Sequence, residues 1–361
     1  MKKRIGVLTG GGDCPGLNAV LRVITKTAIQ DFGMEVYGFE DGYAGLVENR
    51  FRPLSSWDVS GILTLGGTIL GTSNRANPFK YPILKKQKLT YRDLSNQALR
   101  HYRKLGLEAI IAIGGDGTLS IASHLMKMGF NMVGVPKTID NDLKGTDFTF
   151  GFDSAVAIVT EAMDRIHTTA ESHHRVMIVE VMGRYAGWIA LYGGMAGGGD
   201  IILIPEIPFD FKKVFSKIKE RHKMGKNFSI VVVAEGAYPF RGHQIVKQKV
   251  KGSPDPIRLG GISALLSEKI EKKTGFESRF TVLGHLQRGG SPTAFDRILA
   301  TRFGYEALQL IVKGDFGKMV ALQGNEIESI PIEQAIGDLK KVPLDHPLIK
   351  VGRSLGISFG N

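Results

Sequence analysis

Two short stretches of the sequence carry residues that suit phosphoryl transfer. Residues 110–118 (IIAIGGDGT) are an apolar run ending in Gly-Gly-Asp-Gly, where missing Cβ atoms let backbone N–H groups close around phosphate oxygens. Asp116 in this turn is placed to hold Mg²⁺, which proteins bind through one or two carboxylates plus substrate phosphates. Residues 136–142 (PKTIDND) follow another apolar run, and Asp140 there can take a proton from a substrate hydroxyl. The pair indicates a phosphoryl-transfer site.

A third glycine-rich turn, residues 10–18 (GGGDCPGLN), joins the first apolar run to a helical pattern. The start of such a helix offers its N–H groups and its dipole to an anion. The turn fails the dinucleotide fingerprint at Pro15, and it fails the P-loop pattern at Leu17 and Asn18. A tight strand-to-helix turn capped by Asn18 therefore stays open as an alternative.

Basic and acidic residues follow the later apolar runs. Arginine binds phosphate in a bidentate, permanently charged manner, and a carboxylate at a strand end suits sugar hydroxyls. Residues 182–184 (MGR), Glu235 and residues 285–288 (HLQR) all occupy such positions. The arginines beside these runs are Arg175, Arg184, Arg279 and Arg288. Surface salt bridges remain an alternative for them, and a single histidine such as His285 is more often structural.

The two central motifs also have structural alternatives. Asp116 could cap the next helix, and residues 138–142 could form an Asx-turn or a helix cap. Their combination with the downstream arginines favours phosphoryl transfer, because that reaction needs a metal ligand, a base and positive charge together.

The elements that must position these residues alternate between strands and helices. Short apolar runs that are buried on both faces, separated by helical patterns, predict an α/β fold with a parallel sheet. We expect a domain boundary near residue 150 and a surface insertion at residues 240–258. The expected strands are residues 5–8, 110–113, 132–135, 176–181, 201–204, 230–234 and 281–283. The expected helices are residues 18–30, 96–104, 154–168 and 262–272.

Composition narrows the class of protein. The chain has 361 residues, 43% of them hydrophobic, which is enough for two domains with full cores. A single cysteine, Cys14, excludes an internal disulfide framework and favours a cytoplasmic location. No run approaches the roughly 18 apolar residues of a membrane span, so no membrane partner is expected. The net charge of +12 fits anionic substrates better than nucleic acid, since the lysine clusters lack interleaved aromatic residues.

Five motifs in this order resemble the successive signatures of the 6-phosphofructokinase family, over almost the whole chain. They are residues 11–18, 114–117, 138–142, 181–185 and 284–292. The resemblance implies two similar doubly wound, three-layer α/β domains with mainly parallel sheets and an active site in the cleft between them. It implies a larger nucleotide-binding domain of residues 1–150 and about 290–337. The smaller, sugar-phosphate-binding domain would comprise residues 151–289 and about 338–361.

The resemblance also implies a role for each matching residue, in an enzyme of glycolysis. Asp140 would be the general base, with Thr138 and Arg184 as further catalytic groups, and Asp116 would hold Mg²⁺. The nucleotide would be bound by Gly12, Arg75, Gly115, Asp116, Gly117 and Thr118. The loop that carries Arg75 departs from the commoner family spacing by one residue. Fructose 6-phosphate would contact Thr138, Ile139, Asp140, Arg175, Met182, Gly183, Arg184, Glu235, Arg279, His285 and Arg288. Arg175 and Arg279 would reach in from a neighbouring subunit, so the resemblance implies a homo-oligomer, dimer or tetramer, with shared active sites.

Two positions bear on the phosphoryl donor. Pyrophosphate users of this family typically have Asp where this chain has Gly117, and they have a lysine at the position of Lys137. An Asp at 117 would occupy and repel the place of the nucleotide α-phosphate, so glycine favours ATP. Lys137 is also found in a mixed ATP-using subgroup, and pyrophosphate stays the second candidate.

Other functions remain as alternatives. A lipid or NAD kinase would share residues 114–117 without needing the arginine motifs, and a non-catalytic sugar-phosphate-binding subunit would lose Asp116 or Asp140. Of the family's effector-site arginines only Arg22 is matched, because Ser56 and His167 stand at two other places. We therefore expect a weak response to ADP or phosphoenolpyruvate.

Overall fold

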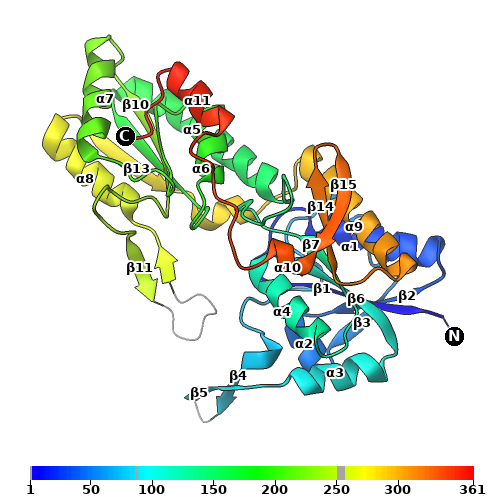
Figure 1. Cartoon of the computed structure of the whole chain (residues 1–361). Coiled ribbons are helices and arrows are strands. Elements are labelled where there is room, and N and C mark those ends of the chain that lie inside the picture. Colours follow the sequence, from blue (N-terminus) through cyan, green and yellow to red (C-terminus); the bar gives the residue numbers. More distant parts are fainter. Residues whose placement is uncertain (1, 86–87, 250–256) are drawn as a thin grey trace.

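The computed structural model describes residues 2–85, 88–249 and 257–361. It has two lobes, each built around its own sheet (Figure 1). Three crossings of the chain join the lobes, near residues 137–151, 288–293 and 336–346. Among the described residues, every helix is too short or too polar to cross a bilayer.

The larger lobe contains a seven-stranded sheet in the order β15-β14-β7-β6-β1-β2-β3. Its inner pairs are parallel, and the edge strands β3 and β15 are antiparallel to their neighbours. The chain proceeds from β1 to β2 on one side and from β6 to β7 on the other, so the topological switch lies between β1 and β6. The strands are β1 (Arg4–Thr9), β2 (Glu35–Phe39), β3 (Phe51–Leu54), β6 (Leu107–Gly114), β7 (Met132–Pro136), β14 (Lys318–Gln323) and β15 (Glu326–Pro331).

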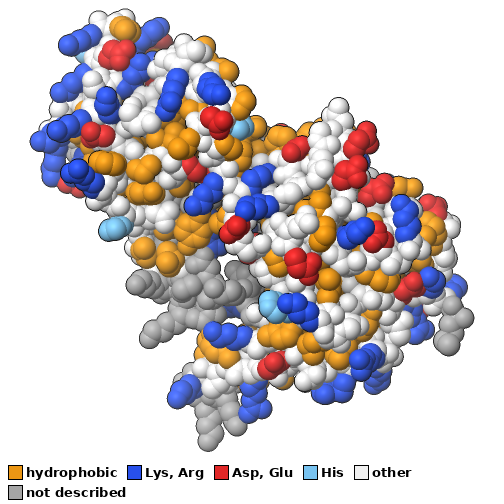
Figure 2. Space-filling view, viewed as in Figure 1, with side chains coloured by type: hydrophobic (Ala, Val, Ile, Leu, Met, Phe, Trp, Pro, Cys, Tyr) orange, Lys and Arg blue, Asp and Glu red, His pale blue; other side chains and the backbone are white. Residues whose placement is uncertain are grey.

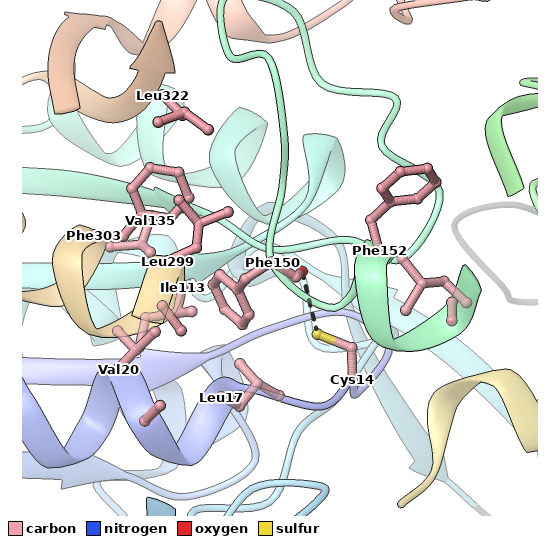
Figure 3. Packing of buried hydrophobic residues seen from close by; sticks show 14 of the residues in the cluster. Cys14, Leu17, Val20, Ile113, Val135, Phe150, Phe152, Leu299, Phe303 and Leu322 are labelled. Atoms are coloured by element: carbon pink, nitrogen blue, oxygen red, sulfur yellow. Dashed lines mark hydrogen bonds between the residues drawn. The ribbon is translucent and has the colours of Figure 1, made fainter. Parts of the chain in front are cut away.

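Helices cover both faces of this sheet, which explains why its central strands are apolar throughout. In β6, Ile111 and Ile113 pack into one core cluster, whereas Ile110 and Ala112 pack into another. Figure 3 shows the first cluster, where Leu17 and Val20 meet Ile113 on the sheet. The helices of this lobe are α1 (Leu17–Gln30), α2 (Tyr43–Glu48), α3 (Ser95–Lys104), α4 (Asp116–Met126), α9 (Ala294–Lys313) and α10 (Ile332–Ala335).

Cys14 is part of the same core. Its thiol donates to the carbonyl oxygen of Phe150 at 3.7 Å (Figure 3). Burial raises the pKa of this thiol to about 12, so the sole cysteine stays protonated and unreactive near neutral pH.

The smaller lobe has a four-stranded, fully parallel sheet in the order β13-β8-β10-β9. Its switch point lies between β8 and β13, as that of the larger sheet lies between β1 and β6. The strands are β8 (Val176–Val181), β9 (Ile201–Leu203), β10 (Ser229–Ala234) and β13 (Ser278–Val282). The helices are α5 (Phe152–His173), α6 (Trp188–Ala196), α7 (Phe211–Lys223), α8 (Ile262–Thr274) and α11 (Pro347–Ser354).

The structure departs from the predicted elements in two places. The expected strand at residues 281–283 runs instead over 278–282, because Leu283 already turns into the 3₁₀ helix η3 (Gly284–Arg288). The expected surface insertion at 240–258 contains two paired strands that were not predicted, β11 (Val246–Lys249) and β12 (Ile257–Leu259). Residues 250–256 lie outside the described part. Further elements are the hairpin β4 (Tyr81–Lys85) and β5 (Lys88–Arg92), and the 3₁₀ helices η1 (Ile62–Thr64) and η2 (Pro78–Lys80).

Candidate active site

Two glycine-rich turns lie side by side at the carboxyl edge of the larger sheet. Residues 10–12 follow β1 and residues 114–117 follow β6, its direct neighbour. The N–H of Gly10 donates to the carbonyl of Ile113 at 2.9 Å and holds the turns together. A Cβ on Gly10 would lie 2.7 Å from the Oγ1 of Thr118, so this turn can approach α4 only as glycine. Ligands of open α/β sheets bind at such a switch point.

Asp116 opens α4 at this edge. Its Oδ1 accepts the N–H of Gly337 at 2.9 Å, and the residue remains partly exposed. The described residues contain no group of three or more His, Cys, Asp or Glu side chains that could hold a metal by themselves. One carboxylate beside a glycine-rich turn that could hold phosphate matches the needs of Mg²⁺, which takes its remaining ligands from phosphate and water.

Gly117 differs from its neighbours because nothing in the fold requires glycine there. A Cβ at 117 would have no atom within 4 Å, and its backbone is not left-handed. The position is exposed in the first turn of α4. The space beside it is therefore open for a ligand.

The third group of residues follows β7. The N–H of Lys137 donates to the carbonyl of Gly114 at 3.1 Å, which joins this segment to the β6 turn. The Lys137 side chain is buried, and its ammonium donates to the carbonyl of Gly12. Burial lowers its pKa. One side chain thus ties the β7 segment to the β1 turn.

The carboxyl group of Asp140 lies in this segment without a hydrogen-bond partner for Oδ1, although Oδ1 is shielded from water. Burial raises the pKa of Asp140, and the charges of Arg288, Arg184 and Lys137 oppose that rise. Its backbone N–H donates to the Oγ1 of Thr138 at 3.1 Å. A carboxyl group with one shielded, unpartnered oxygen and cations around it has the properties of a general base that awaits a substrate hydroxyl group.

Asp142 adds a second buried carboxyl group to the same segment. Burial, followed by the charge of Asp140, raises the pKa of Asp142 to about 7, and a hydrogen bond from Thr138 opposes the rise. Asp116 contributes further repulsion. The negative charges of these carboxyl groups disfavour one another's ionisation, and the partly exposed Asp116 remains the carboxylate whose surroundings fit Mg²⁺.

The smaller lobe presents its residues at the carboxyl edge of its own sheet. Arg184 follows β8, has a left-handed backbone with φ 53°, and donates its N–H to the Oε1 of Glu235 at 3.2 Å. Burial raises the pKa of Glu235 to about 7, helped by the charge of Asp140. The N–H of Met182 donates to the Oε1 of Gln287 in η3 at 3.3 Å.

Arg288 connects the two edges. It ends η3, and its Nη1 donates to the carbonyl of Asp13 in the β1 turn at 3.2 Å. Positive side chains also gather where the two lobes meet in the space-filling view (Figure 2). The candidate site therefore combines glycine-rich turns from one lobe with arginines and a carboxyl group from the other.

Comparison with known proteins shows the family and the fold of this chain. The Phosphofructokinase family profile matches residues 4–311. The chain belongs to the phosphofructokinase family. It is 52% identical to the ATP-dependent 6-phosphofructokinase 2 of Clostridium perfringens, over 99% of both chains. It is also 52% identical to the pyrophosphate--fructose 6-phosphate 1-phosphotransferase of Streptomyces coelicolor, over 99% of this chain and 100% of the relative. Among solved structures, a pyrophosphate-dependent phosphofructokinase from Nitrosospira multiformis has the same fold, with a TM-score of 0.81, 19% identity, and coverage of 100% of this chain and 93% of that one.

Most residues predicted for this phosphofructokinase lie near the two facing edges. The turns bring together Gly12, Gly115, Asp116, Gly117, Thr118, Lys137, Thr138, Ile139 and Asp140. The strand ends of the smaller lobe carry Met182, Gly183, Arg184, Glu235, His285 and Arg288. Arg75 is exposed in a loop held against the β1 turn, where the carbonyl of Ser73 accepts the N–H of Gly11 at 3.1 Å.

Arg175 and Arg279 lie apart from this group. Arg175 directly precedes β8 and Arg279 is the second residue of β13, so both sit at the amino end of the small sheet. Both pair with Glu277, at 2.9 Å for Arg175 and 2.5 Å for Arg279. The length of β8 separates them from Arg184, about 17 Å at the rise of a strand. Within one chain they do not join the site.

Two further residues within the motifs contact the candidate site and had no predicted role. Asp142 ends the motif at residues 138–142, for which a turn was the structural alternative, and only its burial next to Asp140 distinguishes it from a solvated turn residue. Gln287 is fully buried and orients the backbone at Met182. Its signal in the sequence was weak, since a glutamine between His285 and Arg288 looks like an exposed polar residue.

Proposed function

We propose that this phosphofructokinase transfers the γ-phosphoryl group of MgATP to the 1-hydroxyl of D-fructose 6-phosphate, forming fructose 1,6-bisphosphate and ADP. The observation that carries the proposal is the shielded carboxyl oxygen Oδ1 of Asp140, which has no hydrogen-bond partner and lies near Arg184 and Arg288 of the smaller lobe. Transfer to an alcohol requires a base beside the attacking hydroxyl group, which Asp140 would supply. It also requires groups that hold the donor phosphates, which the glycine-rich turns after β1 and β6 would supply.

In the proposed reaction Asp140 takes the proton of the attacking hydroxyl. Arg184 and Arg288 carry permanent positive charge close to Asp140, where it would stabilise charge on the transferred group and opposes the rise of the Asp140 pKa that burial causes. Thr138 would contact the transferred phosphoryl. Mg²⁺, bound at Asp116, would neutralise charge on the donor phosphates.

The sugar phosphate would lie against the smaller lobe. Glu235, fixed by the backbone of Arg184, would accept sugar hydroxyls, and Met182, Gly183 and His285 would line the same side. Arg175 and Arg279 would complete the phosphate site of a neighbouring subunit, since their own site lies a strand length away. The active enzyme would then be a homo-oligomer. The nucleotide-binding and sugar-binding domains would divide near residues 150, 290 and 337.

The choice of ATP rests on Gly117. Position 117 has room for a side chain, and the fold does not demand glycine, so an open position there suits the nucleotide α-phosphate. Lys137 is the residue type that favours pyrophosphate as the donor. Its ammonium group donates a hydrogen bond to the backbone carbonyl of Gly12. That structural role is compatible with either donor. Pyrophosphate remains the second candidate because a pyrophosphate-named relative is 52% identical to this chain.

Replacing the base tests the proposal. We expect Asp140→Ser to lower kcat by at least about 100-fold, the usual contribution of a general base, while fructose 6-phosphate binding stays within about tenfold. Steady-state rates and calorimetric titration with fructose 6-phosphate measure the two quantities. Near-normal turnover of Asp140→Ser would remove Asp140 as the base.

A further inference from the structure

The segment between α10 and α11 contacts both lobes beside the candidate site. We call residues 337–342 the strap. In Figure 1 the chain after α10 passes from the larger lobe to the smaller one along this segment. The N–H of Gly337 donates to Asp116, as described above, and the N–H of Val342 donates to the Oε1 of Glu206 at 2.9 Å. Glu206 in turn accepts the N–H of Gly187 at 3.0 Å, close to Arg184.

Lys340 lies at the centre of the strap and holds the segment that carries the base. Its N–H donates to the carbonyl of Asp142 at 2.7 Å. Its ammonium donates to the Oδ1 of Asn141 at 3.0 Å and to the carbonyls of Thr146 and Asp147, each at 2.9 Å. An ammonium group has three donors, so all three are used inside the protein and none is left for a ligand.

The partners of Lys340 include a strained residue next to the base. Asn141 has a left-handed backbone with φ 51° and is 2% exposed. Its Oδ1 accepts a second hydrogen bond, from the N–H of Thr149 at 3.1 Å. The Oγ1 of Thr149 donates to the carbonyl of Thr138 at 2.7 Å. Lys340 therefore acts on both sides of Asp140 through a closed network of hydrogen bonds.

The smaller lobe holds Lys340 from the other side. The Nε1 of Trp188 in α6 donates to the carbonyl of Lys340 at 2.9 Å, and the ammonium lies 5.5 Å from the centre of the Trp188 ring. The same residue thus joins the base segment of one lobe to a helix of the other. Lys340 thereby links the position of α6 to that of Asp140.

We propose that Lys340 is a positioning residue: its ammonium fixes the Thr138–Asp142 segment, and with it Asp140, against the smaller lobe. The proposal rests on the proposed function, since it assigns a supporting group to that reaction. A displacement of the reacting groups by about 1 Å is enough to slow an enzyme about 100-fold. Lys340 touches no predicted substrate position, so its loss should change kcat rather than substrate affinity.

The test compares Lys340→Met with Lys350→Met, a control with the same change at an exposed lysine of α11. We expect Lys340→Met to lower kcat between about 10- and 100-fold, with KM values for both substrates within about threefold. Lys350→Met should behave as wild type. Equal kcat in all three proteins would overturn the proposal.

A pH profile separates positioning from a general loss of stability. Burial lowers the pKa of Lys340 to about 8, opposed by the charges of Asp142 and Asp147, while Trp188 covers it with an uncharged ring. The ammonium is therefore lost as pH rises through about 8. Wild-type kcat should fall over that range, and Lys340→Met should lack this fall. An identical alkaline limb in both proteins would contradict the proposal.

A second variant keeps the test valid if Lys340→Met does not fold. Asn141→Gly removes the side-chain acceptor, and glycine tolerates the left-handed backbone. Asn141→Gly should also lower kcat. The variant that combines Lys340→Met with Asn141→Gly should have a kcat no lower than that of the slower single variant, because both changes break the same hydrogen-bond network. Multiplying effects would overturn the proposal. If wild type used neither ATP nor pyrophosphate, the proposed function would fall instead.

Discussion

Replacing Gly117 by aspartate should impair the use of ATP while leaving the fold intact. The new side chain has room, because no atom lies within 4 Å of a Cβ at this position. It would also stand in the first turn of α4, where a negative charge stabilises the helix dipole. We therefore expect the melting temperature of Gly117→Asp to equal or exceed that of wild type.

The size of the effect follows from the repulsion between the new carboxylate and a donor phosphate. Two unit charges 4 Å apart interact by about 1 kcal/mol in water and about 4 kcal/mol at the effective dielectric near a protein surface. Position 117 is exposed in the free protein but would be covered by a bound nucleotide, so an intermediate value of about 2.7 kcal/mol is appropriate. That corresponds to a loss of about 100-fold in kcat/KM for ATP.

The assay is the initial rate with varied ATP, saturating fructose 6-phosphate and Mg²⁺, for wild type, Gly117→Asp and Gly117→Asn. Asparagine has the size of aspartate without its charge, so it isolates the steric part. The reasoning predicts that Gly117→Asp is about 100-fold below Gly117→Asn. If both variants kept wild-type kcat/KM for ATP, position 117 would not face the donor.

Three further outcomes follow from single contacts. Since the pKa of Glu235 is raised to about 7, its ionised form appears as pH rises through 7. In rate measurements between pH 6 and 8, kcat/KM for fructose 6-phosphate should therefore rise in wild type, and it should change less in Glu235→Gln. Gly236→Ala should lower kcat, because a Cβ there would overlap the carbonyl oxygen of Arg184; unchanged kinetics would show that the Arg184 turn relaxes freely. Burial raises the pKa of Asp296 to about 6, above its value of about 4 in the unfolded chain. Between about pH 4 and 6 the unfolded state therefore loses its proton first, and the folded protein becomes less stable as pH rises. Asp296→Asn should raise the free energy of unfolding above pH 6, by at most about 3 kcal/mol, and leave it unchanged at pH 4. The asparagine keeps the oxygen that accepts both bonds from Ser154, and equal gains in denaturation midpoint at both pH values would argue against this cause.

The larger features of the fold were predictable because they depend on local patterns. Runs such as residues 110–113 and 230–234 are buried on both faces, and continuous apolar runs of this length are typical of parallel strands. Parallel strands place their carboxyl ends along one edge, so motifs at strand ends predicted the neighbourhood of Asp116 and Asp140. The motif at residues 284–288 also lies at such an edge.

The remaining features depend on contacts between distant parts of the chain. Arg288 binds the turn at Asp13, and Lys340 binds the segment at Asn141, but no spacing rule links such pairs. The β4–β5 hairpin escaped prediction because β4 (YPILK) contains Pro82, which argues against a strand, and β5 (KLTYR) has only two apolar residues, Leu89 and Tyr91. Its strand β5 has four exposed residues out of five.

The motifs alone did not separate the arginines at the two ends of a strand. Arg175 and Arg184 flank the same strand, β8, yet one belongs to the site edge and the other to the opposite edge. Only the direction of the strand separates them, and the pairing of Arg175 with Glu277 becomes visible only in three dimensions. The participation of Arg175 and Arg279 in a neighbouring subunit's site stays a prediction.

The most direct test of the account is the initial rate of the purified wild-type protein with fructose 6-phosphate and Mg²⁺, with ATP and pyrophosphate compared side by side. The account predicts turnover with ATP and no significant turnover with pyrophosphate, because Gly117 leaves the α-phosphate position open. Turnover with pyrophosphate alone would contradict the assignment of the donor, and turnover with neither would contradict the proposed phosphofructokinase reaction itself.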